Sequence, residues 1–364
     1  MKEGWEYKSL GDVCEILDSR RKPITKSKRE SGTIPYYGAT GILDYVKDYI
    51  FDEKLVLLGE DGAKWGAGEN SAYIVEGKTW VNNHAHALRP KREHLIDELL
   101  VYYLNFANLQ PFITGVTVPK LNQEKMRSIE IPVPSLSEQQ SIVDYLDSAF
   151  AKIDAMKANA EKALNEAKAL FQASLKEMLE PKEGWEEKKF GEVCWYNKNN
   201  GIHKGTRYVG MEHIEQGTGV LLGTISSDEV LSNTFAFSKG DVLYGRLRPY
   251  LKKVIVADFD GCCSTEIFPV QSKDIAASFL MYWFLTDEIT NKVNATCAGC
   301  RMPRGNMNDV LKFDISYPPH SEQKSIVETL DSLKSKIDRL QENYNKISQE
   351  CDALKQAILR QIFE

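Results

Sequence analysis

The feature that most constrains the fold of this chain of 364 residues is an internal sequence repeat. Residues 2–14 and 182–194 agree at nine of 13 positions, and both begin with the letters KEGWE. Residues 137–143 read SEQQSIV, and residues 321–327 read SEQKSIV. Because these matches lie 180 and 184 residues apart, we expect two related units in tandem.

Each copy ends in a segment of helical periodicity, 137–180 in the first and 320–364 in the second. A proline followed by Ser-Glu-Gln is typical of a helix N-terminus. Apolar residues then alternate at spacings of three and four, which is the a/d pattern of a coiled coil. They are Ile142, Leu146, Ala149, Ile153, Met156, Ala160, Ala163, Ala167 and Leu170 in the first helix, and Ile326, Leu330, Leu333, Ile337, Leu340, Tyr344, Ile347, Cys351, Leu354 and Ile358 in the second.

A long amphipathic helix cannot bury its apolar seam alone, so a partner is needed. We predict that the two helices pair with each other, antiparallel, about an approximate two-fold axis. The alternative, in which each helix packs on its own module, stays open.

The preceding segments, 1–136 and 181–319, show short strand patterns broken by Gly and Pro, with short helices expected at 94–108 and 274–291. We therefore predict an α+β fold: two similar mixed domains, each with a mostly antiparallel sheet, separated by the antiparallel helix pair. Residues 20–120 and 200–300 share little beyond scattered glycines. A constant frame around different inserts suggests two modules with different targets.

Bulk charge argues mildly against nucleic acid, because the net charge is −6 and a DNA-binding surface is basic. Residues 1–136 carry 18 basic and 19 acidic side chains, and residues 181–319 carry 16 and 17, so a local basic face remains open. No run of about 18 apolar residues exists and no apolar leader follows Met1. With seven scattered cysteines, we expect reduced thiols in the cytoplasm and no membrane contact.

Motifs that carry chemistry are missing. Residues 76–79 read EGKT but lack the first glycine of a phosphate loop. Cys297 and Cys300 form a lone CxxC pair, which is a weak zinc signal. Cys262 and Cys263 would complete a zinc set only if they lay close to that pair, and adjacent cysteines rarely bind the same zinc. His84 and His86 alternate on a predicted strand, so we expect both side chains to face the same way, and structural hydrogen bonds are favoured over a metal or acid–base role. We predict no catalytic residue, no metal and no cofactor.

Basic clusters interleaved with aromatic residues occur in both modules, and Lys and Arg are the side chains that neutralise phosphates or pair with guanine. A charge run is often only a solvated face, but corresponding clusters in both halves favour double-stranded DNA. The candidate DNA-binding residues are Arg20, Arg21, Lys22, Lys26, Lys64, Lys120, Lys204, Arg207, Arg246, Arg248, Lys252, Arg301 and Arg304.

The whole chain resembles the DNA-specificity subunit of type I restriction-modification systems. The resemblance rests on the repeated openings, on residues 59–63 (GEDGA) and 83–90 (NHAHALRP), and on 240–243 and 263–266. The most family-specific part is the segment 132–143, repeated at 318–327.

The resemblance implies two target-recognition domains, 1–136 and 181–319, each reading half of a split DNA sequence. It implies that the conserved helices 137–180 and 320–364 set the spacer between the halves and dock two methyltransferase (modification) subunits, to which restriction subunits join. Catalysis would then lie on partner chains. The alternatives are a related restriction-modification class with fused or separate subunits, an enzyme that acts on nucleic acid by itself, and a coiled-coil adaptor without DNA affinity.

Overall fold

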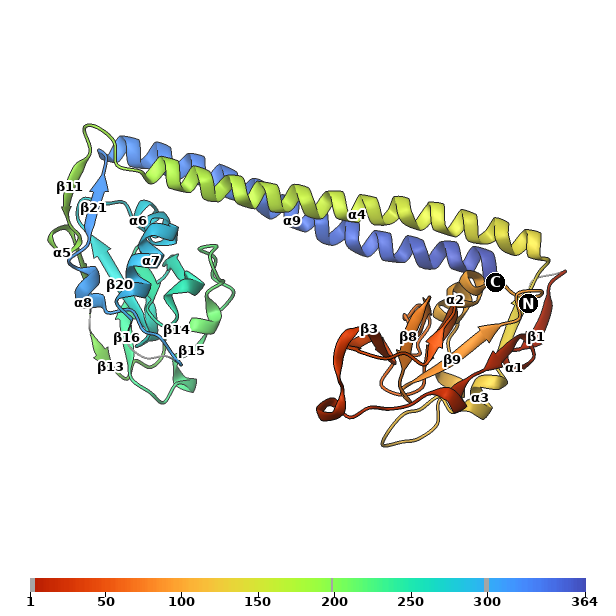
Figure 1. Cartoon of the computed structure of the whole chain (residues 1–364). Coiled ribbons are helices and arrows are strands. Elements are labelled where there is room, and N and C mark those ends of the chain that lie inside the picture. The colour runs from red at the N-terminus through yellow and green to blue at the C-terminus, as the bar shows by residue number, and fades with distance from the viewer. Residues whose placement is uncertain (1–3, 198, 298–300) are drawn as a thin grey trace. The chain divides into compact units, whose positions relative to one another are not determined.

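The computed structural model describes residues 4–197, 199–297 and 301–364 (Figure 1). The chain divides into two compact units, Met1–Ala160 with Tyr344–Glu364, and Glu161–Asn343. Each unit contains one mixed module and stretches of two 44-residue helices, α4 (Leu136–Leu179) and α9 (His320–Phe363). No helix within the described ranges is both long enough and apolar enough to span a membrane.

The first module, which is the part of the first unit outside the long helices, is built on short sheets. The strands pair as β1 (Glu6–Ser9) with β10 (Glu130–Val133); as β2 (Cys14–Ile16), β9 (Ala85–Pro90), β6 (Leu55–Gly59) and β7 (Ala72–Val75); and as β4 (Gly41–Val46), β3 (Ser31–Gly38), β8 (Lys78–Val81) and β5 (Phe51–Asp52). The helices are α1 (Leu10–Val13), α2 (Asp97–Phe106) and α3 (Gln123–Arg127), with 3₁₀ turns η1 (Asp18–Arg20), η2 (Lys26–Lys28) and η3 (Gln110–Phe112).

The second module, in the second unit, follows the same plan. The strands pair as β11 (Glu186–Lys189) with β21 (Asp314–Tyr317); as β12 (Cys194–Tyr196), β20 (Ile267–Ser272), β17 (Val242–Gly245) and β18 (Val254–Val256); and as β13 (Asn200–Gly201), β16 (Thr234–Phe237), β19 (Gly261–Ser264), β14 (Arg207–Val209) and β15 (Ile225–Ser226). The helices are α5 (Phe190–Val193), α6 (Ala277–Leu285), α7 (Asp287–Ala295) and α8 (Met307–Val310), with 3₁₀ turns η4 (Met211–His213), η5 (Ser227–Glu229) and η6 (Pro249–Leu251).

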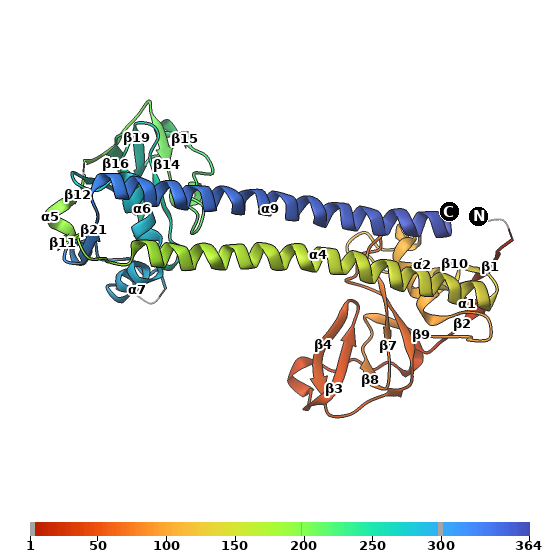
Figure 2. The same ribbon diagram turned by 90° about the horizontal axis from the view of Figure 1, so that it is seen from above.

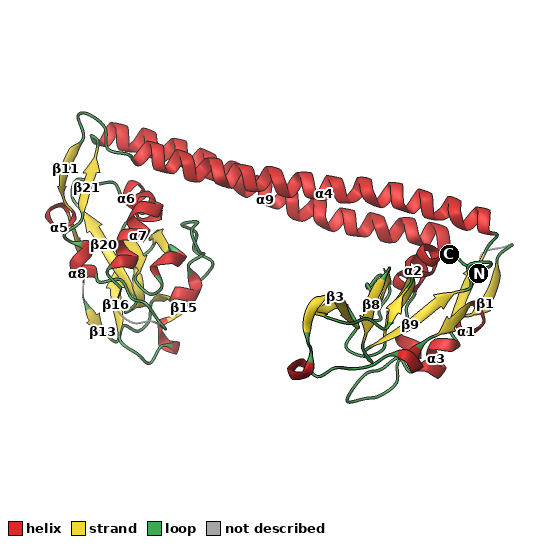
Figure 3. Cartoon of the chain, viewed as in Figure 1, coloured by secondary structure: helices red, strands yellow, loops and turns green. Residues whose placement is uncertain are grey.

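Corresponding strands keep the same order and register in the two modules. β2 pairs antiparallel with β9 from Cys14 opposite Pro90, and β12 pairs antiparallel with β20 from Cys194 opposite Ser272. The central strands β6 and β17 are buried at every position, because their apolar runs are covered on both faces. The predicted fold, two similar α+β modules with a pair of long helices, is confirmed. Figure 3 shows the short strands and the many loops between them.

The expected helix at 274–291 is two helices. Thr286 separates α6 from α7, and its side chain accepts a hydrogen bond from the backbone N–H of Ile289, which caps α7. The helix α4 is also capped differently from the prediction, because the hydroxyl of Ser135, rather than that of Ser137, accepts from the N–H of Glu138.

In the first unit, the beginning of α4 packs antiparallel against the end of α9 (Figure 2). Lys157 lies 3.3 Å from Asp352, and Lys355 lies 2.6 Å from Asp154, so the residue number on one helix rises as the other falls. In the second unit, Lys168 on the later part of α4 donates to Gln341 on α9 at 2.9 Å. The predicted antiparallel pairing is therefore present within each unit.

Three of the nine predicted seam positions of α4 are exposed, namely Met156, Ala163 and Leu170. Leu146 and Ile153 are buried as expected, but Leu164 and Phe171 are buried in place of Ala163 and Leu170. Met156 is 59% exposed and Leu354, on α9, is 48% exposed, so both also lie outside the seam. The reason is the alanine-rich middle of α4, which offers two apolar stripes of similar spacing on neighbouring faces.

The SEQ motif at each helix start attaches the helix to its module. The buried side chain of Gln139 accepts from the N–H of Ile96 at 2.8 Å and donates to the carbonyls of His94 and Pro134 at 2.7 and 2.8 Å. Ile96 directly precedes α2, so a single amide satisfies backbone groups from two segments. We call this arrangement the glutamine clamp.

The second unit repeats the clamp. Gln323 accepts from the N–H of Ala276 at 2.8 Å, directly before α6, and donates to the carbonyls of Asp274 and Pro318 at 3.0 and 2.9 Å. Two further hydrogen bonds also repeat: Trp5 donates to Glu138 as Trp185 does to Glu322, and Tyr102 donates to Asp147 as Tyr282 does to Asp331. The matching sequence segments are therefore the residues that join each helix to a module.

We expect Gln139→Ala to lower the free energy of unfolding by roughly 1–3 kcal/mol, because buried backbone groups lose their partners. Thermal unfolding followed by circular dichroism measures this loss. Gln140→Ala is the matched control, because Gln140 is exposed and bonds only to Asp144, and it should stay within about 0.5 kcal/mol of the parent. Equal effects of the two substitutions would contradict the clamp.

Candidate nucleic-acid interface

The basic residues predicted in the first module fall into two groups. Lys22, Lys26 and Lys64 have exposed side chains. Arg20 lies over the ring of Phe51 at 4.5 Å and donates to the carbonyl of Ile50 at 3.0 Å. The exposed lysines are therefore available to a ligand, whereas Arg20 is held against its own module.

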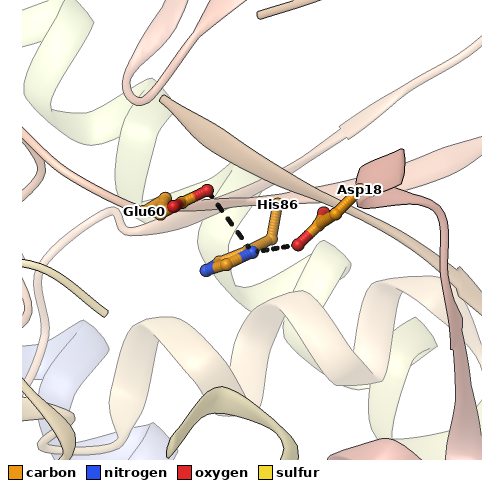
Figure 4. A group of neighbouring side chains, drawn as sticks. All are labelled: Asp18, Glu60 and His86. Atoms are coloured by element: carbon orange, nitrogen blue, oxygen red, sulfur yellow. Dashed lines mark hydrogen bonds and ion pairs between the residues drawn. The ribbon is translucent and has the colours of Figure 1, made fainter. Parts of the chain in front are cut away.

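Arg21 lies in a buried polar network that joins four segments of the chain. Figure 4 shows three other members of this network, Asp18, Glu60 and His86. The guanidinium of Arg21 donates to Glu60 at 2.5 Å and lies 3.3 Å from Asp18. Lys120 reaches the other oxygen of Glu60 at 2.7 Å. His86 lies 2.6 Å from Asp18 through Nδ1 and donates to the carbonyl of Leu121 through Nε2 at 2.7 Å.

The cations of this network keep its carboxylates ionised. Burial alone would raise the pKa of Asp18, but the hydrogen bond from His86 and the nearby charge of Arg21 outweigh it and lower that pKa. For Glu60, burial also acts to raise the pKa, and the bonds from Lys120 and Arg21 lower it. The network therefore ties η1, the loop after β6, the start of β9 and the loop before α3 together.

Among the described residues, Asp18, Glu60 and His86 also form a group whose ligand atoms lie within 4.8 Å of one another, as a metal site requires. The same carboxylates already contact the positive groups of Arg21 and Lys120, which would repel a metal cation. The arrangement therefore favours a charge-compensated structural network over a metal centre.

The two histidines do not share one strand face as predicted. His86 lies on β9 and is fully buried, whereas His84 precedes the strand, is exposed, and pairs with Asp61. The predicted preference for structural hydrogen bonds holds for His86. Trp65, next to Lys64, is buried and donates to the carbonyl of Gly59 at 3.0 Å, so this aromatic ring supports the glycine-rich loop from inside.

The loop between η3 and α3 is exposed from Gly115 to Pro119. It turns back on itself, with Thr114 and Lys120 exchanging backbone hydrogen bonds of 2.8 Å. At its tip, Val116 and Val118 are both largely exposed, although they are apolar. Lys120 at its base thus stands beside a projecting loop.

In the second module, Glu266 accepts from two of the predicted arginines. Arg246 donates through Nε at 3.0 Å and Arg304 through Nε at 2.8 Å, one to each carboxylate oxygen. Arg207 is exposed and stacks on the ring of Phe259 at 3.4 Å. These arginines are oriented by neighbours while part of each side chain remains accessible.

Other predicted basic residues of this module play local roles. Lys204 donates to three backbone carbonyls at 3.0 to 3.4 Å. Lys252 is mostly buried and donates to the carbonyl of Leu285 and to Asp287 at 2.9 and 2.6 Å. The ammonium groups of both lysines are therefore engaged within the module.

The loop between β17 and β18 carries the described non-glycine residues with a left-handed backbone, Arg248 at φ 52° and Lys252 at φ 47°. Such a conformation costs free energy and persists only where surrounding contacts impose it. Here the N–H of Arg248 donates to the carbonyl of Pro303 at 2.7 Å. The result projects Arg248 and Tyr250 into solvent.

The remaining predictions concern Arg301 and the cysteines. Arg301 is exposed, next to residues 298–300, which lie outside the described part, so the CxxC motif cannot be placed at Cys300. Cys262 and Cys263 are neighbours on β19, and burial raises the pKa of both thiols. Adjacent strand positions point to opposite faces, which disfavours a shared metal.

Sequence reasoning missed the carboxylates that hold the basic side chains. Asp18, Glu60 and Glu266 are ordinary acidic residues in sequence, and their partners lie 20 or more positions away in most of these pairs. Glu60 and Glu266 lie in the segments GED (59–61) and STE (264–266), which belong to the family resemblance. Nothing else in the sequence singles them out.

Comparison with known proteins places this duplicated α+β architecture in one class. A family model described as the type I restriction modification DNA specificity domain matches residues 2–166 and again residues 182–349. The chain therefore belongs to the type I restriction modification DNA specificity family, and the resemblance seen in the sequence is confirmed.

Individual relatives agree. The type I restriction enzyme EcoDI specificity subunit of Escherichia coli is 26% identical over 401 residues, which cover 99% of this chain and 88% of that protein. A chain solved in work on complex assembly and conformational transition of the type I R-M system has a TM-score of 0.73 at 18% identity, covering 100% of this chain and 98% of that one. The crystal structure of the HsdS subunit from Thermoanaerobacter tengcongensis gives a TM-score of 0.58 at 18% identity, with 100% and 97% covered. These two structures support the fold.

The lowered pKa values of Asp18 and Glu60 predict acid sensitivity of the first unit. Both carboxyls bind protons less readily when folded, so their stabilisation is present above their ordinary pKa values of 3.8 and 4.5 and is lost as the pH falls through the lowered values. Asp18→Asn should cost about 3–5 kcal/mol at pH 7, because it breaks a buried ionic network.

Denaturant unfolding at pH 7 and in steps below pH 4 checks this expectation. The cost of Asp18→Asn should shrink as the pH falls, because the parent loses the same charge. The exposed Asp48→Asn serves as control and should change stability by less than about 0.5 kcal/mol at either pH. A pH-independent cost of Asp18→Asn would count against the ionic interpretation.

Proposed function

We propose that this chain is the non-catalytic DNA sequence-recognition subunit of a type I restriction-modification complex. In this proposal, each module (1–136 and 181–319) reads one half of a bipartite target in double-stranded DNA. Methylation and cleavage are carried out by modification and restriction subunits. The observation that carries the proposal is that both modules share the strand order of the sheet around β6 and β17 and the glutamine clamp, while the loops between the strands differ.

The candidate DNA contacts are the accessible basic residues. The exposure of Lys22, Lys26 and Lys64 supports a role as DNA contacts in the first module. In the second module, Arg207 and Arg248 combine exposure with a fixed local conformation. Arg21 and Lys252 act instead through the surfaces that they stabilise, because their charged groups are engaged inside the modules.

We expect co-expression with the cognate modification subunit to give adenine methylation at a bipartite sequence in the host genome. Single-molecule mapping of methyladenine returns both half-sites and the spacer. Arg248→Ala should weaken the base preference in the half-site read by the second module and leave the other half-site unchanged. Methylation or cleavage by the purified chain alone would contradict the assignment of catalysis to partners.

The helix segments 137–180 and 320–364 are proposed to set the spacer between the half-sites. Each helix has 44 residues, which corresponds to about 66 Å at ~1.5 Å per residue. Each unit contains a stretch of both helices and one module, so the helices connect the two readers.

Insertion of seven residues into both helices, in matching register, should lengthen the spacer by about 3 base pairs, since ~10.5 Å of helix corresponds to that length of duplex. Neither half-site should change. The same methylation map provides the measurement, and an unchanged spacer in a folded, active complex would refute the helices as the spacer-setting element.

An outward apolar stripe on α4 is proposed to dock a modification subunit, and the proposed stoichiometry is two such subunits for each chain. In the first unit, Tyr145 and Met156 are 54% and 59% exposed, and a separation of 11 residues puts them on one helix face. The exposure of these two side chains supports the choice of this face for the proposed contact.

The double substitution Tyr145→Glu with Met156→Glu should reduce co-purification of the modification subunit at least tenfold, because two charges would be desolvated in the contact. Ala158→Glu is the matched control, since it adds a charge at an exposed position on a different face of α4. Retention of the partner by the double variant would exclude this stripe as its docking surface.

A further inference from the structure

A junction of loops in the first module is defined by backbone hydrogen bonds. After β6 ends, the N–H of Glu60 donates to the carbonyl of His84 at 2.9 Å. The N–H of Leu121 then donates to the carbonyl of Glu60 at 2.8 Å, and Asp61 forms an antiparallel bridge with Lys120. The loop before α3 is thereby fixed against the end of the central strand.

The second module contains the same junction. After β17 ends, the N–H of Arg246 donates to the carbonyl of Glu266 at 2.9 Å. The N–H of Gly305 donates to the carbonyl of Arg246 at 2.9 Å, and Leu247 forms an antiparallel bridge with Arg304. These contacts make Lys120 and Arg304 equivalent residues in the two modules.

The turn that carries each basic residue is rigid in the same way. Pro119 precedes Lys120 and Pro303 precedes Arg304. Two residues further on, an asparagine caps the following helix in both modules: Asn122 accepts from the N–H of Lys125, and Asn306 accepts from the N–H of Asn308. A positively charged side chain is thus held on a fixed turn in both modules.

Around this turn the charges of the two modules differ. The position of Glu60 is occupied by Arg246 in the second module, and that of His84 by Glu266. The carboxylate that binds the basic residue therefore comes from positions that are not equivalent in the two modules, yet the basic side chains are exposed to nearly the same extent, 42% for Lys120 and 43% for Arg304. The positive charge at the turn is retained while its surroundings change.

A charge retained by both modules fits a role that both half-sites share. Phosphates occupy equivalent places along any duplex, whereas base edges differ from one half-site to the other. Lys and Arg both bind phosphate through their positive charge, so an exchange of one for the other between the modules is compatible with a phosphate contact in each.

We propose that Lys120 and Arg304 are equivalent phosphate-binding residues, each anchoring its module on the DNA backbone without reading sequence. This inference rests on the proposed DNA recognition. Glu60 and Glu266 engage one side of each basic group, and the remaining donors of Lys120 Nζ and the terminal amino groups of Arg304 face the phosphate. The differing neighbours at the junction remain available for contacts specific to each half-site.

The test measures binding of the complete complex with its modification subunit to two labelled duplexes, the mapped target and a scrambled duplex of equal length, between 50 and 200 mM salt. Lys120→Ala and Arg304→Ala should each reduce the magnitude of the log–log salt slope by about 0.9, the value for one phosphate contact. Both duplexes should weaken by a similar factor. In these alanine variants Glu60 keeps its ion pair with Arg21, and Glu266 keeps its ion pair with Arg246. We therefore expect both variants to fold.

The charge-preserving exchanges Lys120→Arg and Arg304→Lys should restore the slope and leave both half-sites unchanged in the methylation map. Lys8→Ala and Lys188→Ala are matched controls, because these equivalent lysines are 38% and 40% exposed and paired with carboxylates on β1 and β11, and their slopes should equal the parent's.

An unaltered slope in both alanine variants, with a salt-dependent parent, would overturn the phosphate assignment alone. Loss of one half-site in Arg304→Lys would also overturn it, in favour of base reading. A parent complex without salt-dependent affinity for either duplex would instead contradict the proposed DNA recognition.

Discussion

The attachment of each long helix to its module depends on one buried amide. Gln139 and Gln323 each satisfy three backbone groups at the place where the module ends and the helix begins. Buried backbone groups must find hydrogen-bond partners. The start of each long helix is therefore fixed against the start of a short helix, which is α2 in the first module and α6 in the second. The loops that differ between the modules therefore belong to modules that are attached to their long helices in the same way.

Much of this frame was predictable from the sequence because it is repeated. The pairing of the helices and the α+β character of both modules followed from periodicities that local sequence carries. The phase of α4 did not, because Ala160, Ala163 and Ala167 provide an apolar surface on either side, and only larger residues such as Leu164 and Phe171 decide which side is buried.

The candidate site was predicted less completely, for a physical reason. Basic clusters are visible in sequence, but whether a lysine is free depends on carboxylates brought to it by the fold. Lys252 and Lys22 are the same residue type in similar basic clusters of the sequence. In the structure, Lys252 is mostly buried beside Asp287, whereas Lys22 is exposed. The equivalence of Lys120 and Arg304 rests on backbone contacts between distant segments, and the short match between residues 119–122 (PKLN) and 303–306 (PRGN) gains its meaning only from those contacts.

The first unit is completed by the last residues of the chain. Leu359, Ile362 and Phe363 belong to the same apolar core as Leu10 and Leu100, and the ring of Phe363 stacks on Phe106 at 5.5 Å. The second unit, in contrast, is continuous from Glu161 to Asn343. During synthesis the second unit therefore has its whole sequence once Asn343 has been added, whereas the first module, which is made earliest, lacks part of its apolar core until Leu359, Ile362 and Phe363 follow.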